Sequence, residues 1–190
     1  MHYNIGRHFW KNKNVFVTGH TGFKGSWLCI FLKYLGAHVT GYSLSPTTKP
    51  NLFNLAKINR VVKKSIIADV RDYKKLYKEI KNSKATIVFH LAAQPLVRYS
   101  YLLPKETFDT NVVGSLNVLE CVRKTKKRIK VFNPSSVEIF GKFKKKRRNE
   151  NSDFDPQNFF ALSKLISLKI MQSYRQQFKI WTYTENLKLT

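Results

Sequence analysis

The sequence predicts an α/β protein built on a doubly wound parallel sheet. Short apolar runs alternate along the chain with longer stretches of helical periodicity, as in parallel strands joined by helices. The first of these runs is followed directly by a glycine-rich turn and then by a helical stretch, which is how a βαβ unit begins. The 190 residues, with a hydrophobic content of 43%, suffice for one domain with a substantial core.

The individual elements follow from these patterns in chain order. Strands are expected at residues 15–18, 38–42, 65–68, 86–90 and 129–133, and residues 179–184 are compatible with a sixth. Helices are expected at residues 23–35, 73–81, 104–124 and 157–176. Gly36 ends the first helix as a C-cap residue does, and Pro104 suits a first helical turn, where its missing N–H costs nothing. Residues 1–190 show no internal repeat and no second domain.

The stretch VFVTGHTGFKGSWL, from Val15 to Leu28, carries the strongest functional signal. In such a unit Gly19 permits the turn, Gly22 lets backbone approach a pyrophosphate, and Gly25 allows close packing of helix on strand. The helix that follows offers free N–H groups and the positive end of its dipole to phosphates. The pattern therefore predicts dinucleotide binding, although a glycine triad also occurs in turns that bind nothing.

The charge balance is strongly basic. Thirty-five Lys and Arg residues stand against 11 Asp and Glu, a formal net charge of +24, which attracts polyanions and could support non-specific nucleic-acid binding. The densest run, KFKKKRR at residues 142–148, contains one aromatic residue and no reading helix. A solvated loop is therefore favoured there over an anion-binding patch.

The cysteines and apolar runs indicate the compartment. Cys29 and Cys121 lie in apolar helical patterns, so we expect small core residues in a reducing environment and no metal site. No apolar run approaches the roughly 18 residues of a transmembrane helix. Residues 1–13 contain no hydrophobic segment of a secretory signal. These observations predict a cytoplasmic protein without membrane contact.

The glycine motif is spaced G-x-x-G-x-x-G and is followed by VTGYSLSPTTKPNLF and HLAAQPLVR. Together these segments resemble the extended short-chain dehydrogenase/reductase superfamily, and most closely the nucleotide-sugar 4,6-dehydratases of the CDP-glucose type. The resemblance reaches to about residue 178 and implies a Rossmann-type fold without its C-terminal substrate domain. The segment NPSSVEIFG looks more like the GDP-mannose type, so the substrate class stays open.

The resemblance also implies which residues bind the cofactor, which it identifies as NAD. The end of the second strand, Tyr42-Ser43-Leu44-Ser45, has neither the acid typical of NAD binding nor the arginine typical of NADP binding, which leaves NADP open. A helix-capping role would explain Asp69 nearly as well. Asn111 lies in mid-helix, where a polar residue usually faces solvent. The implied cofactor-binding residues are Gly19, Thr21, Gly22, Phe23, Gly25, Asp69, Val70, Leu91, Ala92, Ala93, Asn111 and Lys164.

The catalytic positions implied by the resemblance are Ser136, Glu138 and Lys164. Ser136 would hydrogen-bond the sugar 4-hydroxyl, and Glu138 would remove the C5 proton unless it is only a solvated loop carboxylate. Val137 occupies the position where several families carry an acid that helps to expel the C6 hydroxyl. We expect His90, at a strand end, to be packed or hydrogen-bonded in the core.

One departure from the family pattern is decisive. The superfamily uses Tyr-x-x-x-Lys on a helix, where the lysine lowers the pKa of the tyrosine that accepts the hydroxyl proton. Here Phe160 stands four residues before Lys164, and a phenyl ring cannot hold a proton. Loss of a general base typically costs roughly 10²–10⁴ in rate.

Three hypotheses remain. The first is a 4,6-dehydratase that oxidises C4 with NAD, eliminates water across C5–C6 and returns the hydride to C6, impaired by Phe160 and by a truncated or shifted reading frame after about residue 178. The second is a non-catalytic NAD(P)-binding module that forms a homodimer through helices 104–124 and 157–176. The third is a basic nucleic-acid-binding protein.

Overall fold

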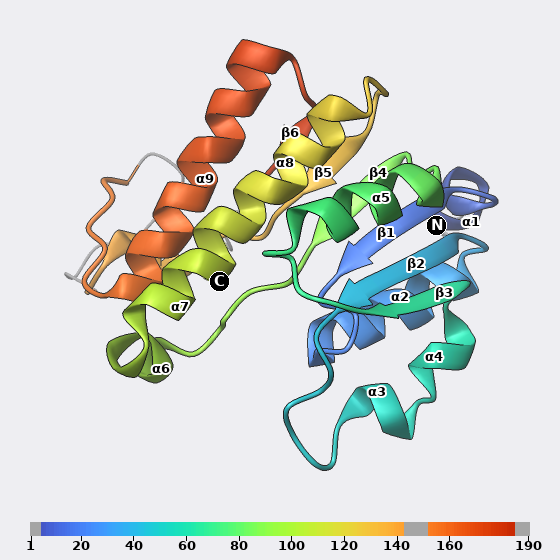
Figure 1. Ribbon diagram of the computed structural model, residues 1–190, viewed down its shortest axis with the longest axis horizontal. Helices are drawn as coiled ribbons and strands as arrows, with labels where there is room; N and C mark the ends of the chain where they lie inside the picture. Colours follow the sequence, from blue (N-terminus) through green and yellow to red (C-terminus); the bar gives the residue numbers. More distant parts are fainter. Residues whose placement is uncertain (1–4, 143–151, 185–190) are drawn as a thin grey trace.

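The computed structural model describes residues 5–142 and 152–184, which form a six-stranded parallel sheet with helices on both faces (Figure 1). The strand order β3-β2-β1-β4-β5-β6 confirms the doubly wound arrangement, because the chain winds outward from β1 toward one edge and from β4 toward the other. The strands are β1 (Asn14–Thr18), β2 (His38–Ser43), β3 (Lys64–Ile67), β4 (Ile87–His90), β5 (Lys130–Phe132) and β6 (Thr182–Tyr183).

The helices form a layer on each face of this sheet (Figure 1). On the face we call the front lie α5 (Tyr73–Ser83), α8 (Gly114–Lys124) and α9 (Phe159–Phe178). On the back, α1 (Ile5–Trp10) and α2 (Phe23–Tyr34) lie behind the sheet, with α3 (Leu52–Leu55) and α4 (Ile58–Val61) beside α2. The remaining elements are α6 (Val97–Leu102), α7 (Pro104–Phe108), the π-helical turn η1 (Asp109–Val113) and the 3-10 turn η2 (Val137–Phe140).

The core is divided by the sheet. Successive residues of a strand point to opposite faces, so Phe16 lies in the front core while Val15 and Val17 lie in the back core. Cys29 is buried in the back core and Cys121 in the front core, and both thiols are free, as predicted. The glycine turn after β1 is therefore fixed between two packed layers.

The predicted elements are present with small differences in their bounds. The helix expected at 104–124 is divided by η1 into α7 and α8, and the helix expected at 157–176 starts later because Asn158 caps α9 by accepting a hydrogen bond from the Ala161 N–H. The sixth strand is confined to Thr182–Tyr183. The short helices α1, α3, α4 and α6 escaped prediction because they are too short to show a clear period.

One sequence prediction falls largely outside the described residues, because residues 143–148 of the basic run are not among them. Within residues 5–142 and 152–184, no helix combines the length and apolar character that a membrane span requires. The same residues contain no group of three His, Cys, Asp or Glu side chains arranged to hold a metal ion.

Candidate functional site

The predicted residues of the glycine turn and of the loop from Leu91 to Ala93 lie beyond the carboxyl ends of β1 and β4. These strands are neighbours in the sheet, yet the chain leaves them toward opposite edges, and open α/β sheets bind ligands at such a switch point. The Leu91 N–H donates to the Thr18 carbonyl at 3.2 Å, and the Ala92 N–H donates to Thr18 Oγ1 at 3.1 Å. The glycine turn and the loop after β4 therefore form one connected rim.

Two of the three motif glycines are required by the packing of the protein itself. Gly19 has φ of +74°, and a Cβ there would lie 2.7 Å from the backbone of Leu91 and Ala92. A Cβ on Gly25 would lie 2.0 Å from the Gly19 carbonyl oxygen. Gly22 is different, because a Cβ there would only touch that oxygen at 3.4 Å. The exposed Gly22 thus leaves open space at the start of α2, where a phosphate would approach.

The other residues of the turn anchor it to β2 and β3. Thr21 Oγ1 donates to the Leu44 carbonyl at 2.8 Å and lies 2.8 Å from Ser43 Oγ. The buried His20 bonds Ser65 through Nε2 at 2.7 Å, and its ring fills the space that a side chain at Gly41 would need. Burial lowers the pKa of His20 to about 4. Sequence reasoning gave His20 no role.

Phe23 and Asp69 differ in exposure: Phe23 is exposed and Asp69 is half-buried. Phe23 is exposed at the first turn of α2. The Asp69 carboxylate accepts hydrogen bonds from the N–H and the Nε of Arg71, each at 2.8 Å. Burial raises the pKa of Asp69, but the hydrogen bonds and charge of Arg71 outweigh it and the net pKa is lowered. Val70 packs against Gly114. A local structural role thus accounts for Asp69, and its contact with a cofactor stays a prediction.

His90 is a buried junction, as expected from its place at a strand end. Its Nδ1 lies 2.7 Å from Thr18 Oγ1, and its Nε2 lies 3.1 Å from Ser115 Oγ. Burial, together with the positive charge of Lys164, lowers the pKa of His90 to about 3. A neutral imidazole therefore links the strand that precedes the glycine turn to helix α8.

Asn111 lies in η1 and is only 2% exposed, so the alternative of a side chain that faces solvent does not hold. Its Oδ1 accepts from the Gln94 N–H at 2.8 Å, while its Nδ2 donates to the Gln94 carbonyl at 3.2 Å and to Ser163 Oγ at 2.9 Å. These partners satisfy the amide in the interior. Asn111 therefore holds the loop after β4 against α9, and its predicted contact with a cofactor is untested.

Two further hydroxyls complete this buried network. Ser115 and Ser167 each donate to the Asn111 carbonyl at 2.6 Å, and their Oγ atoms lie 3.2 Å apart. Sequence reasoning missed both. The spacing of the polar residues could have indicated them. Asn111 and Ser115 are four residues apart, as are Ser163 and Ser167, and residues at this spacing share one face of a helix.

Helix α9 carries Phe160 and Lys164, the two residues at the positions of the Tyr-x-x-x-Lys pattern. Phe160 packs with 8% of its surface exposed. Burial lowers the pKa of Lys164 to about 8, and the charge of Lys24 on the first turn of α2 lowers it further. Within residues 5–142 and 152–184, no hydrogen bond or ion pair reaches the Lys164 ammonium. A desolvated cation without an anionic partner is typical of a ligand-binding site.

Ser136 and Glu138 lie beside this helix. Ser136 follows β5 and caps η2 by accepting the Glu138 N–H at 3.3 Å, while the Glu138 side chain is exposed. The turn η2 packs on α9 through Ile139 and Phe140. The fold thus brings the predicted Ser136 and Glu138 segment alongside the helix of Phe160 and Lys164.

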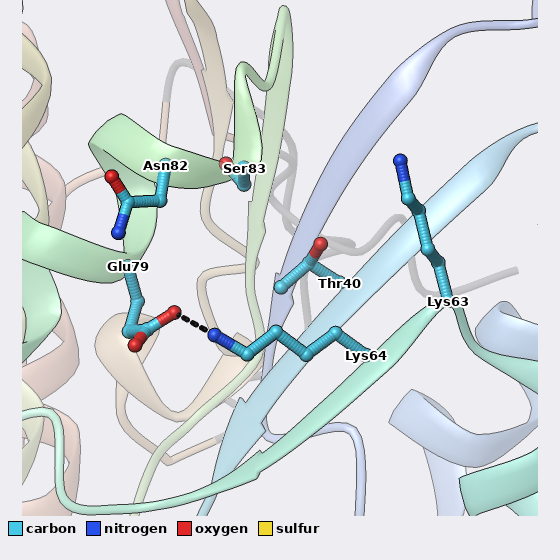
Figure 2. Close-up of a pocket in the computed structure, with 6 residues that line it drawn as sticks. All are labelled: Thr40, Lys63, Lys64, Glu79, Asn82 and Ser83. Carbon is cyan, nitrogen blue, oxygen red and sulfur yellow. Dashed lines mark hydrogen bonds and ion pairs between the residues drawn. The ribbon is translucent and has the colours of Figure 1, made fainter.

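A hollow of about 260 Å³ lies elsewhere on the molecule (Figure 2). Figure 2 shows Lys64 Nζ and Glu79 Oε2 joined across it, at 2.6 Å. It adjoins the amino-terminal end of β3, opposite the carboxyl edge that carries the predicted residues, so it is separate from the candidate site. Its lining residues are Thr40, Lys63, Lys64, Glu79, Asn82 and Ser83.

The sheet order and the glycine turn at the switch point define the class as an α/β protein of the short-chain dehydrogenase/reductase fold. The family model for GDP-mannose 4,6 dehydratase matches residues 16–188, and the chain belongs to this family of nucleotide-sugar 4,6-dehydratases.

Individual relatives agree with this assignment. A CDP-glucose 4,6-dehydratase of Salmonella typhimurium is 49% identical over 136 residues, which cover 72% of this chain and 38% of that protein. GDP-mannose 4,6 dehydratase 2 of Caenorhabditis elegans is 27% identical over 186 residues, 91% of this chain and 48% of that protein. A solved Thermus thermophilus UDP-glucose 4-epimerase in complex with NAD is 27% identical, with a TM-score of 0.81 over 90% of this chain and 53% of its own. The chain thus spans half the length of these curated relatives or less.

Proposed function

We propose that this chain is the NAD-binding part of a nucleotide-sugar 4,6-dehydratase of the CDP-glucose type, acting in the cytoplasm. Two observations carry the proposal: the glycine turn is open at Gly22, and the buried ammonium of Lys164 has no anionic partner among residues 5–142 and 152–184. The identity of 49% to a CDP-glucose 4,6-dehydratase favours that substrate class over GDP-mannose.

The residues present fit a dinucleotide. Gly22 leaves the space that a pyrophosphate needs, and the first N–H groups of the 12-residue helix α2 face that space. The charge of Lys24 helps to lower the pKa of Lys164, so the two cations act on each other and would together attract a phosphate. In this proposal Gly19, Gly22 and Phe23 hold the pyrophosphate, and Lys164 holds the nicotinamide ribose. When bound, NAD supplies a reversible hydride acceptor.

The remaining residues would handle protons. Ser136 would orient the sugar 4-hydroxyl, and Glu138 would take the proton from C5. Phe160 packs where the family tyrosine stands but offers no oxygen to receive the 4-hydroxyl proton. We therefore expect cofactor binding with very weak or absent turnover.

Calorimetric titration of the folded chain with NAD, and separately with NADP, tests the cofactor proposal. We expect Gly22→Ala to weaken binding at least about tenfold, since the methyl group would occupy the phosphate approach. Its unfolding midpoint should be unchanged, because no protein atom crowds that methyl group. Lys33→Ala, at the far end of α2, is the matched control and should bind normally. Failure of both dinucleotides to bind at millimolar concentration would refute the proposal.

A second candidate is a non-catalytic NAD(P)-binding module that forms a homodimer. The altered Phe160 favours it, as do exposed apolar side chains on the predicted dimer helices, namely Phe108, Leu116, Phe159 and Leu162. Replacing Leu116 and Leu162 together by Glu should convert a dimer to a monomer in light scattering. A monomeric parent chain would remove this candidate.

Polyanion binding is the third proposal and rests on the net charge of +24 alone. It predicts an affinity for nucleic acid that falls steeply with salt. Neutralising residues 144–148 should weaken that affinity.

A further inference from the structure

Helix α2 carries aromatic side chains on the face that points away from the sheet. Trp27, Phe31 and Tyr34 follow one another at steps of four and three residues, so they lie along one side of the helix. They are 53%, 57% and 66% exposed, although the outward face of a surface helix is normally polar. The residues buried on the inward face are Gly25, Ser26, Cys29 and Leu32.

Helix α5, on the front of the sheet, shows the ordinary pattern in the same protein. It is 11 residues long against 12 for α2, and it buries Leu76 and Ile80. Its exposed positions include Lys74, Lys75 and Lys78. The outward rings of α2 are therefore a local feature, and neighbouring exposed apolar side chains of this size mark an interaction site.

Helix α1 adds cations beside these rings. It lies on the same face of the sheet as α2 (Figure 1). The Arg7 guanidinium lies 4.8 Å from the centroid of the Tyr34 ring, and the Lys13 ammonium lies 5.4 Å from the centroid of the Phe9 ring. Phe9 is itself 45% exposed. We call the following residues the α1–α2 surface: Arg7, Phe9, Lys11, Lys13, Trp27, Phe31 and Tyr34.

Hydrogen bonds hold the end of α1 against the end of α2. The Asn12 N–H donates to the Gly36 carbonyl at 2.9 Å, and the His38 N–H donates to the Lys13 carbonyl at 2.8 Å. Because the backbone is fixed on both sides, the rings and cations keep their relative positions. A ligand that fits them would bind with little cost of ordering.

No carboxylate of the same part of the chain neutralises this surface. Residues 1–68 contain no Asp and no Glu. Among residues 5–142 and 152–184, the four ion pairs all lie between Lys64 and Arg123. The α1–α2 surface therefore has a positive field, which attracts anions.

The arrangement of rings and cations indicates the class of ligand. A protein interface has an apolar centre inside a polar rim, and a membrane receives a continuous apolar face. Here two cations lie directly over rings, so charge and apolar area are intermixed. Single-stranded nucleic acid has the same mixture, because its phosphates alternate with bases whose faces are free to stack. A duplex covers those base faces and would leave the rings unused.

We propose that the α1–α2 surface binds single-stranded nucleic acid, with phosphates at Arg7, Lys11 and Lys13. Bases would stack on Trp27 and Phe31. The inference rests on the polyanion binding proposed above, to which it assigns a surface and a class of ligand. It does not depend on NAD binding.

The first test removes the rings. Fluorescence anisotropy measures binding of the full 190-residue chain to labelled oligo(dT). Trp27→Ala combined with Phe31→Ala should weaken binding at least about tenfold, because each stacked base contributes to affinity. Trp27→Phe keeps a ring and should bind as the parent does. Tyr101→Ala is the matched control, because Tyr101 is 65% exposed on α6 and lies outside the surface.

The second test compares two charge reversals of equal size. Arg7→Glu combined with Lys11→Glu should lower the affinity and reduce the slope of log K against log salt by about 1.4, which is about 0.7 for each phosphate contact. Lys74→Glu combined with Lys78→Glu changes the net charge equally on α5 and should leave the slope nearly unchanged.

Several outcomes would overturn the proposal. The ring variant binds oligo(dT) as tightly as the parent, the two charge reversals weaken binding equally, or the chain binds phosphatidylserine vesicles and no oligo(dT). If only neutralisation of residues 144–148 weakens binding, polyanion binding stands and this surface is wrong. If the parent binds no oligo(dT) at low salt, both fail. Circular dichroism confirms the fold of each variant, and NAD titration of the same variants tests the cofactor proposal separately.

Discussion

The two sides of the candidate site are maintained by different kinds of interaction. On the glycine turn, two of the residues predicted to bind are also required by packing, since a methyl group on Gly19 or Gly25 would collide with backbone. On α9, Phe160 packs well and differs from tyrosine by one oxygen atom. A side chain at Gly19 or Gly25 would disrupt the fold, whereas a phenyl ring in place of a phenol at residue 160 is compatible with it. The packing of the protein therefore constrains these two glycines more strongly than it constrains the presence of an oxygen atom at residue 160.

The largest expected effect is a gain of activity on restoring the phenol. In a fusion with the second half of the Salmonella relative, Phe160→Tyr should raise the formation of 4-keto product from CDP-glucose by roughly 10²–10⁴, the usual contribution of a general base. Phe159→Tyr, on the neighbouring exposed residue, is the control and should change nothing. If the Phe160→Tyr fusion forms no 4-keto product either, the non-catalytic role is favoured.

The second effect concerns the stability of the turn. Gly25→Ala places a methyl group 2.0 Å from the Gly19 carbonyl oxygen, and the backbone must move. We expect the free energy of unfolding in urea to fall by about 3 kcal/mol. Gly22→Ala is the matched control, with a change within about 0.5 kcal/mol. Equal effects of the two substitutions would contradict the distinction between packing and binding glycines.

The third effect is a trade between stability and binding at Lys164. Lys164→Met removes a desolvated charge, so unfolding at pH 7 should require about 2 kcal/mol more, while NAD binding weakens. The folded-state pKa is about 8, below the ordinary 10.5. The stability gain should therefore be full below pH 8 and shrink as the pH rises toward 10.5. A loss of stability instead would mean that the ammonium is well paired in the chain.

The smallest effect is a pH dependence on the acid side. His90 has a pKa of about 3 in the fold against an ordinary 6.5, so the unfolded chain binds a proton that the folded chain does not. Stability should be constant above 6.5 and then fall with decreasing pH, by about 1.4 kcal/mol per unit for this residue. His90→Gln should reduce that slope in urea titrations from pH 7 to 5. His38→Gln, at an exposed position, should leave the slope unchanged.

The sequence by itself determined the strands and the glycine turn. Both depend on neighbouring residues, because Val15, Phe16 and Val17 form a buried strand and the glycines follow at fixed spacing. Phe160 and Lys164 could likewise be located, since four residues along a helix place both on one face. The short helices and the π-helical turn within 104–124 left no such local pattern.

Only the tertiary structure decided how these parts are connected. His90 meets Thr18 across 72 positions of sequence, and Asn111 meets Ser163 across 52. It also decided that Asn111 is buried and that Thr21 bonds the end of β2, because a polar side chain in the interior takes whichever partner the fold brings within reach. The ring contacts of Phe132 with Phe89 and with Tyr183 have the same origin, because parallel pairing places these three residues side by side on neighbouring strands.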